Sequence, residues 1–426
     1  MWAIAILLVS LVFFSVCHEC TNLFGSLYHH SIYKVHVARD VVSFKRFNVR
    51  TLGERLLIRA LPNQRLIAAF GINNAFTTTD PWVHKRFVRY ATGLINRVNA
   101  DNEEWQHLSL LGRDTLRRHL SADSGREVGD QQQQRLHLTS TVRILCFVVV
   151  LHFLFPGVEN IDLQATRSVT EDINRLWVQS KHASRPVSKR EQDCLVTKIR
   201  QMLPINGKLY DLSGLGEQSN PLNTILPAFE TLWRVVLLTY VHIAFRGTSS
   251  DGPRVTTESL VGDMLADLPS HLGTGNDKES AALMISKEAL RLYPPTKRIH
   301  RAASPFYHHA QTSCPKVVAA DIESLHRDTF IWGHNAHDFF LPRMGQGLTQ
   351  TQKDAYMPFG LAPHLCPASN KFGERMIAML LGVLFSGLGS KGTGTTIEYG
   401  DAELDGDLFA HLPTGREDAE GWSVTL

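Results

Sequence analysis

The stretch that most constrains this chain is residues 357–368, MPFGLAPHLCPA, in which one cysteine comes shortly before a long apolar segment. Pro367 follows Cys366, and proline is tolerated at the first position of a helix because the N–H that it lacks would have no partner there. Apolar residues then recur at helical spacing from Phe372 to Val383. Helix N-termini lower the pKa of a thiol. The pattern therefore predicts a thiolate at Cys366, either a metal ligand or a nucleophile, with a buried and inert cysteine as the alternative.

Composition excludes several classes of protein. Of the 426 residues, 43% are hydrophobic and 20% are charged, which is enough apolar material for a sizeable core. The net charge of +3 is too nearly balanced to predict a nucleic-acid partner. The six cysteines fit no disulfide framework or zinc spacing. Cys17 and Cys20 form a single C-x-x-C motif, which is a weak signal of redox or metal chemistry. We therefore expect a protein that faces a reducing compartment.

The amino-terminal residues 1–17 are uncharged and almost entirely apolar. A secretory signal would begin with basic residues, which are missing here, whereas basic residues follow the apolar segment between residues 34 and 50. By the positive-inside tendency we expect a membrane anchor with the rest of the chain on the cytosolic side; a cleaved signal is the alternative. Residues 18–65 contain no pattern that we can assign.

The residues around Cys366 resemble the cysteine-ligand loop of the cytochrome P-450 (haem-thiolate monooxygenase) family. That loop has a phenylalanine, an arginine or histidine and the cysteine at fixed spacing, and Phe359, His364 and Cys366 stand at those positions. Ala362 stands where the family prefers glycine. The resemblance implies haem b with its iron ligated by Cys366, and contacts of Phe359 and His364 with the cofactor.

A second motif lies in the helix that Asp80 and Pro81 predict, with the aspartate as cap and the proline in the first turn. Trp82 and Arg86 are four residues apart and share one face of that helix. A basic, solvated helix face is the plain interpretation. The pair also resembles the family's Trp-x-x-x-Arg helix, which implies that both side chains hold a haem propionate.

Residues 221–246 are apolar and helical in character, yet Glu230 and Thr231 lie side by side within them. Burying a carboxylate without a partner is expensive, so this acid needs a reason. The pair resembles the family's acid–threonine pair on the long helix that crosses the haem, which implies a proton-relay role for both residues. Pro227 stands where a small residue is usual. An exposed helix edge is the alternative.

Glu288 and Arg291 are three residues apart, hence neighbours on one helix face, and the Tyr-Pro-Pro sequence at 293–295 ends that helix. Together with the cysteine loop about 75 residues later, this resembles the family's Glu-x-x-Arg motif. The resemblance implies a buried structural ion pair that is completed by a later arginine, for which Arg343 is the candidate. Arg298 or Arg301 is a further candidate for a propionate.

The combined motifs predict a mainly α fold with small β-sheets, the cytochrome P-450 fold. We expect an anchor at residues 1–17, a divergent or shortened linker and β lobe at 18–65, and a haem-thiolate catalytic domain at 66–426. Short segments such as VAADIESLHRD resemble fungal, membrane-anchored members of the family.

The function implied by the resemblance is oxidation of a small apolar organic substrate by a haem-dependent monooxygenase, as a tailoring step in fungal secondary-metabolite biosynthesis. Electrons would come from NADPH through a flavoprotein reductase on the same membrane, the endoplasmic reticulum. Two alternatives stay open. One is a truncated, non-catalytic haem-binding or pathway-scaffold relative, and the other is an oxygen-independent haem-thiolate isomerase.

Overall fold

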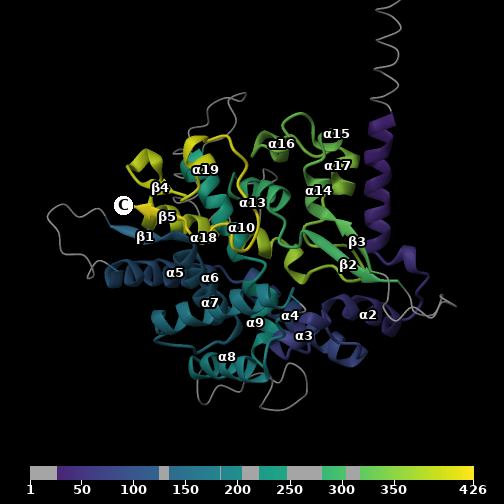
Figure 1. Ribbon diagram of the computed structural model, residues 1–426, viewed down its shortest axis with the longest axis horizontal. Helices are drawn as coiled ribbons and strands as arrows, with labels where there is room; N and C mark the ends of the chain where they lie inside the picture. Colours follow the sequence, from purple (N-terminus) through teal and green to yellow (C-terminus); the bar gives the residue numbers. More distant parts are fainter. Residues whose placement is uncertain (1–25, 124–133, 183, 204–219, 247–280, 304–316) are drawn as a thin grey trace, which may run out of the picture.

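The computed structural model describes residues 26–123, 134–182, 184–203, 220–246, 281–303 and 317–426, and these are mainly helical (Figure 1). The predicted membrane anchor and the pair Cys17 and Cys20 lie outside the described residues. After a helix at residues 26–42, the helices of the first half are α2 (Leu52–Ala60), α3 (Gln64–Phe70), α4 (Pro81–Asn99), α5 (Asn102–Asp123), α6 (Leu138–Leu154), α7 (Leu163–Gln179), α8 (Lys189–Gln201), α9 (Leu222–Phe229) and α10 (Trp233–Val241). Those of the second half are α13 (Ala281–Leu292), α14 (Ile322–His326), α15 (Thr329–Trp332), α16 (Pro342–Gly345), α17 (Gln350–Ala355), α18 (Phe372–Leu388) and α19 (Ala402–Gly406).

The main core surrounds α18, which packs against α5, α10 and α13. Its residues are apolar on almost every face, as expected for a helix with neighbours all round. The apolar helix α6 is buried along nearly its whole length. Two helical stretches, Leu222–Arg246 and Phe372–Thr393, are long and apolar enough to cross a membrane, and each is 78% buried inside the protein.

The long helix predicted over residues 221–246 is interrupted. The helix α9 ends at Phe229 and α10 begins at Trp233, followed by a π-helical turn, η3 (His242–Arg246). Pro227 lies inside α9, where proline weakens the hydrogen-bond ladder. The Thr231 hydroxyl donates to the Pro227 carbonyl at 2.8 Å. Such bonds from threonine compete with the helix ladder, so the break falls at the acid–threonine pair.

Two antiparallel sheets complete the fold. One has the strand order β1 (Arg135–His137), β5 (Ser423–Thr425), β4 (Thr396–Glu398), so the end of the chain pairs with strands from two distant segments. The other pairs β2 (Arg298–Ala302) with β3 (Val317–Asp321).

A second, smaller core lies beside the second sheet. The helix at residues 26–42 packs Val35 and Val41 into it, and Ile322 and Trp332 come from the opposite side. Figure 1 shows this purple helix alongside α14, α15 and α17. In the described part of residues 18–65 the chain is therefore helical, and both strands of the neighbouring sheet come from residues 298–321.

Candidate functional site

The Cys366 loop, defined as residues 357–368, is a compact turn structure. The amide of Cys366 donates to the carbonyl of Phe359 at 3.1 Å, and the amide of His364 donates to that of Leu361 at 3.2 Å. Gly360 has φ +72°, a backbone conformation that residues other than glycine rarely adopt. These bonds close the chain on itself, so the sulfur is carried by a backbone with defined geometry.

The relation between Cys366 and the following helix differs from expectation. Cys366 caps only a three-residue 3₁₀ helix, Pro367–Ser369, and α18 begins at Phe372. The prediction of a lowered thiol pKa is wrong: burial raises the pKa of Cys366 above its ordinary value, although the Ala368 amide and Arg59 act in the opposite direction. Desolvation of the sulfur outweighs the few donors of one short turn. A cationic ligand such as iron would reverse this balance.

Phe359 packs directly on the start of α18. A Cβ added at Gly373 would lie 2.8 Å from two atoms of the Phe359 ring and 3.3 Å from the Ala368 carbonyl oxygen. Glycine at position 373 therefore allows the ring to lie against the helix backbone. The sequence motif identified Phe359, but it did not identify the glycine on which the ring rests.

Three basic side chains gather beside His364 of the Cys366 loop, and we call Arg59, His84, Arg301 and His364 the basic cluster. The His364 and His84 ring centroids are 4.9 Å apart, and Arg59 and Arg301 are only 9% and 6% exposed. Burial, then Arg59, His84, Arg301 and Arg55, lowers the pKa of His364 to about 3. Burial lowers the pKa of Arg59 to about 10 and, with help from Arg59, that of Arg301 to about 9.

The basic cluster has no carboxylate partner among the described residues. Arg59 lies over the Phe76 ring, and Arg301 lies over the Phe44 ring and donates to the His300 carbonyl at 2.9 Å. Within the described part of the chain, neither ring nitrogen of His364 has a hydrogen-bond partner. Burying unpaired cations is expensive. A sulfur beside two uncompensated guanidinium groups fits a cofactor that offers both a metal and carboxylates, as haem does.

Sequence reasoning missed Arg59 and His84. Arg59 belongs to α2, some 300 residues before the cysteine, and nothing in its local pattern marks it as a partner of the loop. His84 stands between Trp82 and Arg86 in α4. Arg301 was one of two candidates for a propionate; the other, Arg298, is largely exposed and pairs with Asp321 at 2.9 Å.

Trp82 and Arg86 occupy the predicted helix, and Asp80 caps it by accepting from the Trp82 amide at 2.7 Å. The Arg86 guanidinium lies over the Trp82 ring at 5.0 Å, and Trp82 is 55% exposed. It is His84, two residues from each, that is buried against His364. The structure brings Trp82 and Arg86 together but turns His84 toward the Cys366 loop.

Glu288, Arg291 and Arg343, the three residues proposed for a structural ion pair, lie together in the interior. Arg291 donates to both carboxylate oxygens of Glu288, at 2.7 and 2.9 Å, and both side chains are fully buried. Arg343 Nε lies 3.5 Å from Glu288 Oε1. Arg291 also donates to three main-chain carbonyls, those of His326, Ala336 and Asp338. This cluster fastens α13 to the segment that leads into the Cys366 loop.

Glu230 and Thr231 lie at the break between α9 and α10 with different surroundings. Glu230 is 2% exposed and pairs with Arg416 through Oε2, while Oε1 has no hydrogen-bond partner among the described residues. Arg416 lies over the Trp177 ring at 4.2 Å. Thr231, the next residue in the same turn, is exposed. The buried partner, Arg416, was not predicted, because it lies 186 positions away in the sequence.

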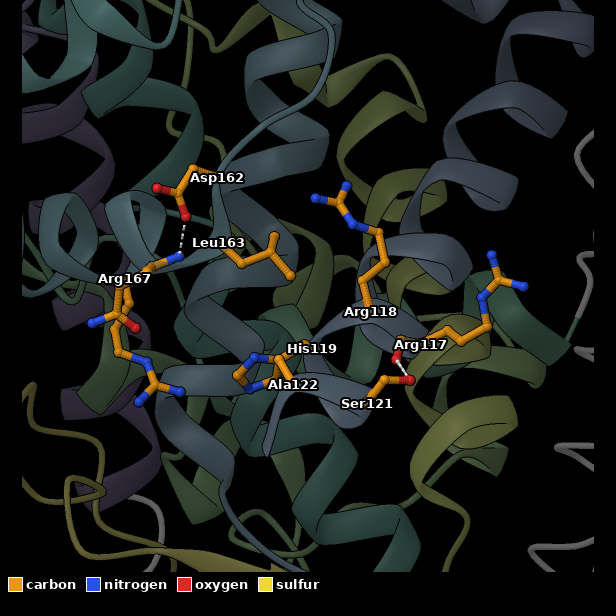
Figure 2. Close-up of a pocket in the computed structure, with 9 residues that line it drawn as sticks. Arg117, Arg118, His119, Ser121, Ala122, Asp162, Leu163 and Arg167 are labelled. Atoms are coloured by element: carbon orange, nitrogen blue, oxygen red, sulfur yellow. Dashed lines mark hydrogen bonds between the residues drawn. The ribbon is translucent and has the colours of Figure 1, made fainter. Parts of the chain in front are cut away.

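A hollow of about 510 Å³ lies between the end of α5 and the start of α7 (Figure 2). Its basic side chains have partners: Arg118 donates to the Ile161 carbonyl at 2.9 Å, Arg117 pairs with Asp114, and His119 contacts the Thr141 hydroxyl. Asp162, which lines the same hollow, caps α7. The described residues contain no cluster of three or more histidine, cysteine or acidic side chains suited to a metal ion.

Comparison with known proteins points to one fold. No family model matches the chain. A stretch of 107 residues is 36% identical to cytochrome P450 714A2 of Arabidopsis thaliana, and covers 24% of this chain and 20% of that protein. Another of 106 residues is 33% identical to 11-oxo-beta-amyrin 30-oxidase of Glycyrrhiza uralensis, with coverage of 24% and 20%. The chain thus matches about a fifth of the length of these curated relatives.

Solved structures match over most of the chain. Ligand-free cytochrome P450 OleT superposes with a TM-score of 0.51 at 13% identity, over 85% of this chain and 82% of that one. Cytochrome P450SP alpha in complex with (R)-ibuprophen gives 0.51 at 14% identity, over 86% and 84%. The chain therefore has the cytochrome P-450 fold, which confirms the predicted fold class.

Proposed function

We propose that this chain is a haem-thiolate monooxygenase that oxidises a small apolar organic substrate, with Cys366 as the residue that would ligate the haem iron. The observation that carries the proposal is the basic cluster beside the Cys366 loop, within the cytochrome P-450 fold. A sulfur ligand and two buried, uncompensated guanidinium groups match the metal and the two carboxylates of haem.

Haem supplies the oxygen-activating redox chemistry when it is bound. The chain's own residues would hold it: Cys366 would offer the sulfur, and Arg59 and Arg301 would offer charge-assisted donors to its propionates. His364 can donate from a ring nitrogen that has no hydrogen-bond partner in the described part of the chain. Trp82 and Arg86 remain proposed propionate contacts through the resemblance of their motif.

The proton-relay role is proposed for Glu230 and Thr231. Glu230 Oε1 is a buried acceptor without a partner among the described residues, so it can receive and pass on a proton while Oε2 stays on Arg416. The Thr231 hydroxyl, one residue away, donates to the Pro227 carbonyl and can accept from a donor on its open side.

The finer assignments rest on the resemblance. We propose an NADPH-dependent flavoprotein reductase as the electron source, and anchoring of residues 1–17 in the endoplasmic reticulum membrane with the catalytic domain in the cytosol. A role in fungal secondary-metabolite biosynthesis is proposed only because short sequence segments resemble those of fungal family members. The curated relatives named above come from plants.

A second candidate function is haem binding without turnover. It is favoured by the Thr231 hydroxyl, which is engaged with the Pro227 carbonyl at the helix break. An arrangement in which this bond persists would hold the hydroxyl away from a relay. The two candidates share Cys366 and the basic cluster, and they differ only in the residues around position 230.

The test is turnover of the full chain, loaded with haem and supplied with NADPH and a reductase, on a panel of apolar substrates. Monooxygenation predicts oxidised product that is lost in Cys366→Ala. The matched control is Cys194→Ala, since Cys194 is an exposed free cysteine elsewhere in the chain. Haem bound without product or NADPH consumption on any substrate would favour the non-catalytic candidate, and product from Cys366→Ala would contradict the assignment.

A further inference from the structure

His326 lies between the Glu288–Arg291 pair and the start of the Cys366 loop. Its side chain is fully buried, at the end of α14. Nδ1 lies 3.1 Å from the carbonyl oxygen of Arg291, and Nε2 lies 3.1 Å from the amide nitrogen of Met357, the first residue of the loop. The imidazole thus spans from α13 to the loop that carries the cysteine.

These two contacts fix the protonation state of the ring. A carbonyl oxygen can only accept, so Nδ1 must carry the hydrogen; an amide N–H can only donate, so Nε2 must present its lone pair. The ring is therefore neutral, with the proton on Nδ1. A proton on Nε2 would replace the Met357 bond with a clash between two N–H groups. It would also add a charge near the Arg291 guanidinium, which itself donates to the His326 carbonyl at 2.7 Å.

The ring is held by stacking as well as by hydrogen bonds. It is stacked on Tyr356 with centroids 5.6 Å apart and planes 21° apart, and it meets Trp332 edge-on at 6.3 Å. The Tyr356 hydroxyl donates to the carbonyl of Lys287 on α13 at 3.1 Å. The entrance of the loop is therefore tied to α13 twice, once through Tyr356 and once through His326.

We propose that His326 is a positioning residue for the Cys366 loop: as an Nδ1-protonated neutral imidazole it ties the backbone of Met357 to that of Arg291. The buried ion pair of α13 then sets the place where the loop starts. The consequence for haem ligation rests on the proposed function, whereas the link itself belongs to the fold. The sequence motifs identified Arg291 and the Cys366 loop, but they did not identify His326, which links the two.

Two amide variants separate the two hydrogen bonds. In His326→Gln the side-chain oxygen reaches about as far as Nε2 and can still accept from the Met357 amide. In His326→Asn the amide reaches only as far as Nδ1 and keeps the bond to Arg291. His326→Phe keeps a stacking ring and loses both bonds. His337→Phe is the matched control, because His337 is an exposed histidine that is also in ring contact, with His411 at 5.1 Å.

The first readout is hydrogen exchange at the Met357 amide in the full chain. Loss of one buried hydrogen bond is expected to speed exchange about fivefold or more in His326→Phe and His326→Asn. His326→Gln and the control should keep the wild-type rate. Equal protection in all variants would overturn the proposal. If a variant does not fold, ¹⁵N shifts of the wild-type ring decide: an Nε2–H tautomer or an imidazolium near neutral pH contradicts it.

The second readout is the spectrum of the reduced, haem-loaded protein with carbon monoxide. We expect the thiolate-ligated fraction to fall by about half or more in His326→Phe, and His326→Gln to restore it. An unchanged fraction in His326→Phe would overturn the positioning role. If the wild-type chain itself binds no haem, the proposed function fails, and the exchange and ¹⁵N measurements still decide on the His326 link.

Discussion

Two glutamates of this protein are buried in ion pairs with arginine, Glu288 with Arg291 and Glu230 with Arg416, and they use their oxygens differently. Both oxygens of Glu288 accept from Arg291, and Oε1 also accepts from the Phe340 amide at 3.1 Å. Glu230 has one oxygen on Arg416 and one that lacks a partner among the described residues.

The difference separates a structural pair from one that can exchange a proton. A buried carboxylate whose two oxygens both accept hydrogen bonds holds its neighbours in one geometry. A buried carboxylate oxygen without a partner is costly, and in native structures such groups call for an explanation, often a catalytic one. We therefore expect the first pair to govern stability and the second to govern chemistry.

The largest expected effect comes from Arg291→Met. It leaves Glu288 buried without its partner and removes donors to three main-chain carbonyls. Breaking a buried pair from one side costs about 3–5 kcal/mol, so this variant should unfold at much lower urea concentration or fail to accumulate. Near-wild-type stability would show that the Glu288–Arg291 pair does not govern stability.

Arg416→Met should cost less, about 1–3 kcal/mol. Arg416 pairs with Glu230 through one carboxylate oxygen, whereas Arg291 donates to both oxygens of Glu288 and to three main-chain carbonyls, so fewer contacts are lost. Urea unfolding of the two variants gives the loss of stability of each. A loss as large as that of Arg291→Met would mean that the two pairs do not differ in kind.

The protein should also become less stable at low pH, because of His326, whose side chain contacts the Arg291 carbonyl. Burial, then Arg291, lowers the pKa of His326 to about 3, whereas an unfolded histidine titrates near pH ~6.5. Because the folded pKa is depressed, the contribution is complete above pH ~6.5 and is lost toward pH ~3, by about 1.4 kcal/mol per pH unit.

This dependence is measured by urea unfolding of the wild type and of His326→Gln between about pH 6.5 and 4.5. The variant lacks the titrating group, so its stability should fall less steeply than that of the wild type. Parallel curves for the two proteins would show that His326 does not titrate as described.

The smallest effect on stability is expected from Thr231→Ala, below about 0.5 kcal/mol, because the side chain is exposed. Its effect on chemistry should be larger: if the hydroxyl relays protons, oxidised product per NADPH falls while NADPH consumption continues. Unchanged coupling would remove Thr231 from the mechanism and leave Glu230 alone in that role.

The features that could be predicted from the sequence were those formed by residues close together in the chain. The cysteine loop, the Glu288–Arg291 pair and the cap at Asp80 depend on residues a few positions apart, where turn and helix geometry decides the contact. Arg416 and Arg59 could not be found in this way, because their partners come from distant segments brought together by packing. The direction in which the pKa of Cys366 is shifted was predicted wrongly for the same reason, since desolvation depends on which residues cover the sulfur.

The central claim is that Cys366 ligates haem iron, and the most direct measurement is the carbon monoxide difference spectrum of the reduced full chain expressed with a haem supply. The account predicts the long-wavelength Soret band of thiolate-ligated haem in the wild type, and its loss in Cys366→Ala with Cys194→Ala unchanged. Haem bound without that band, or no haem at all, would contradict it.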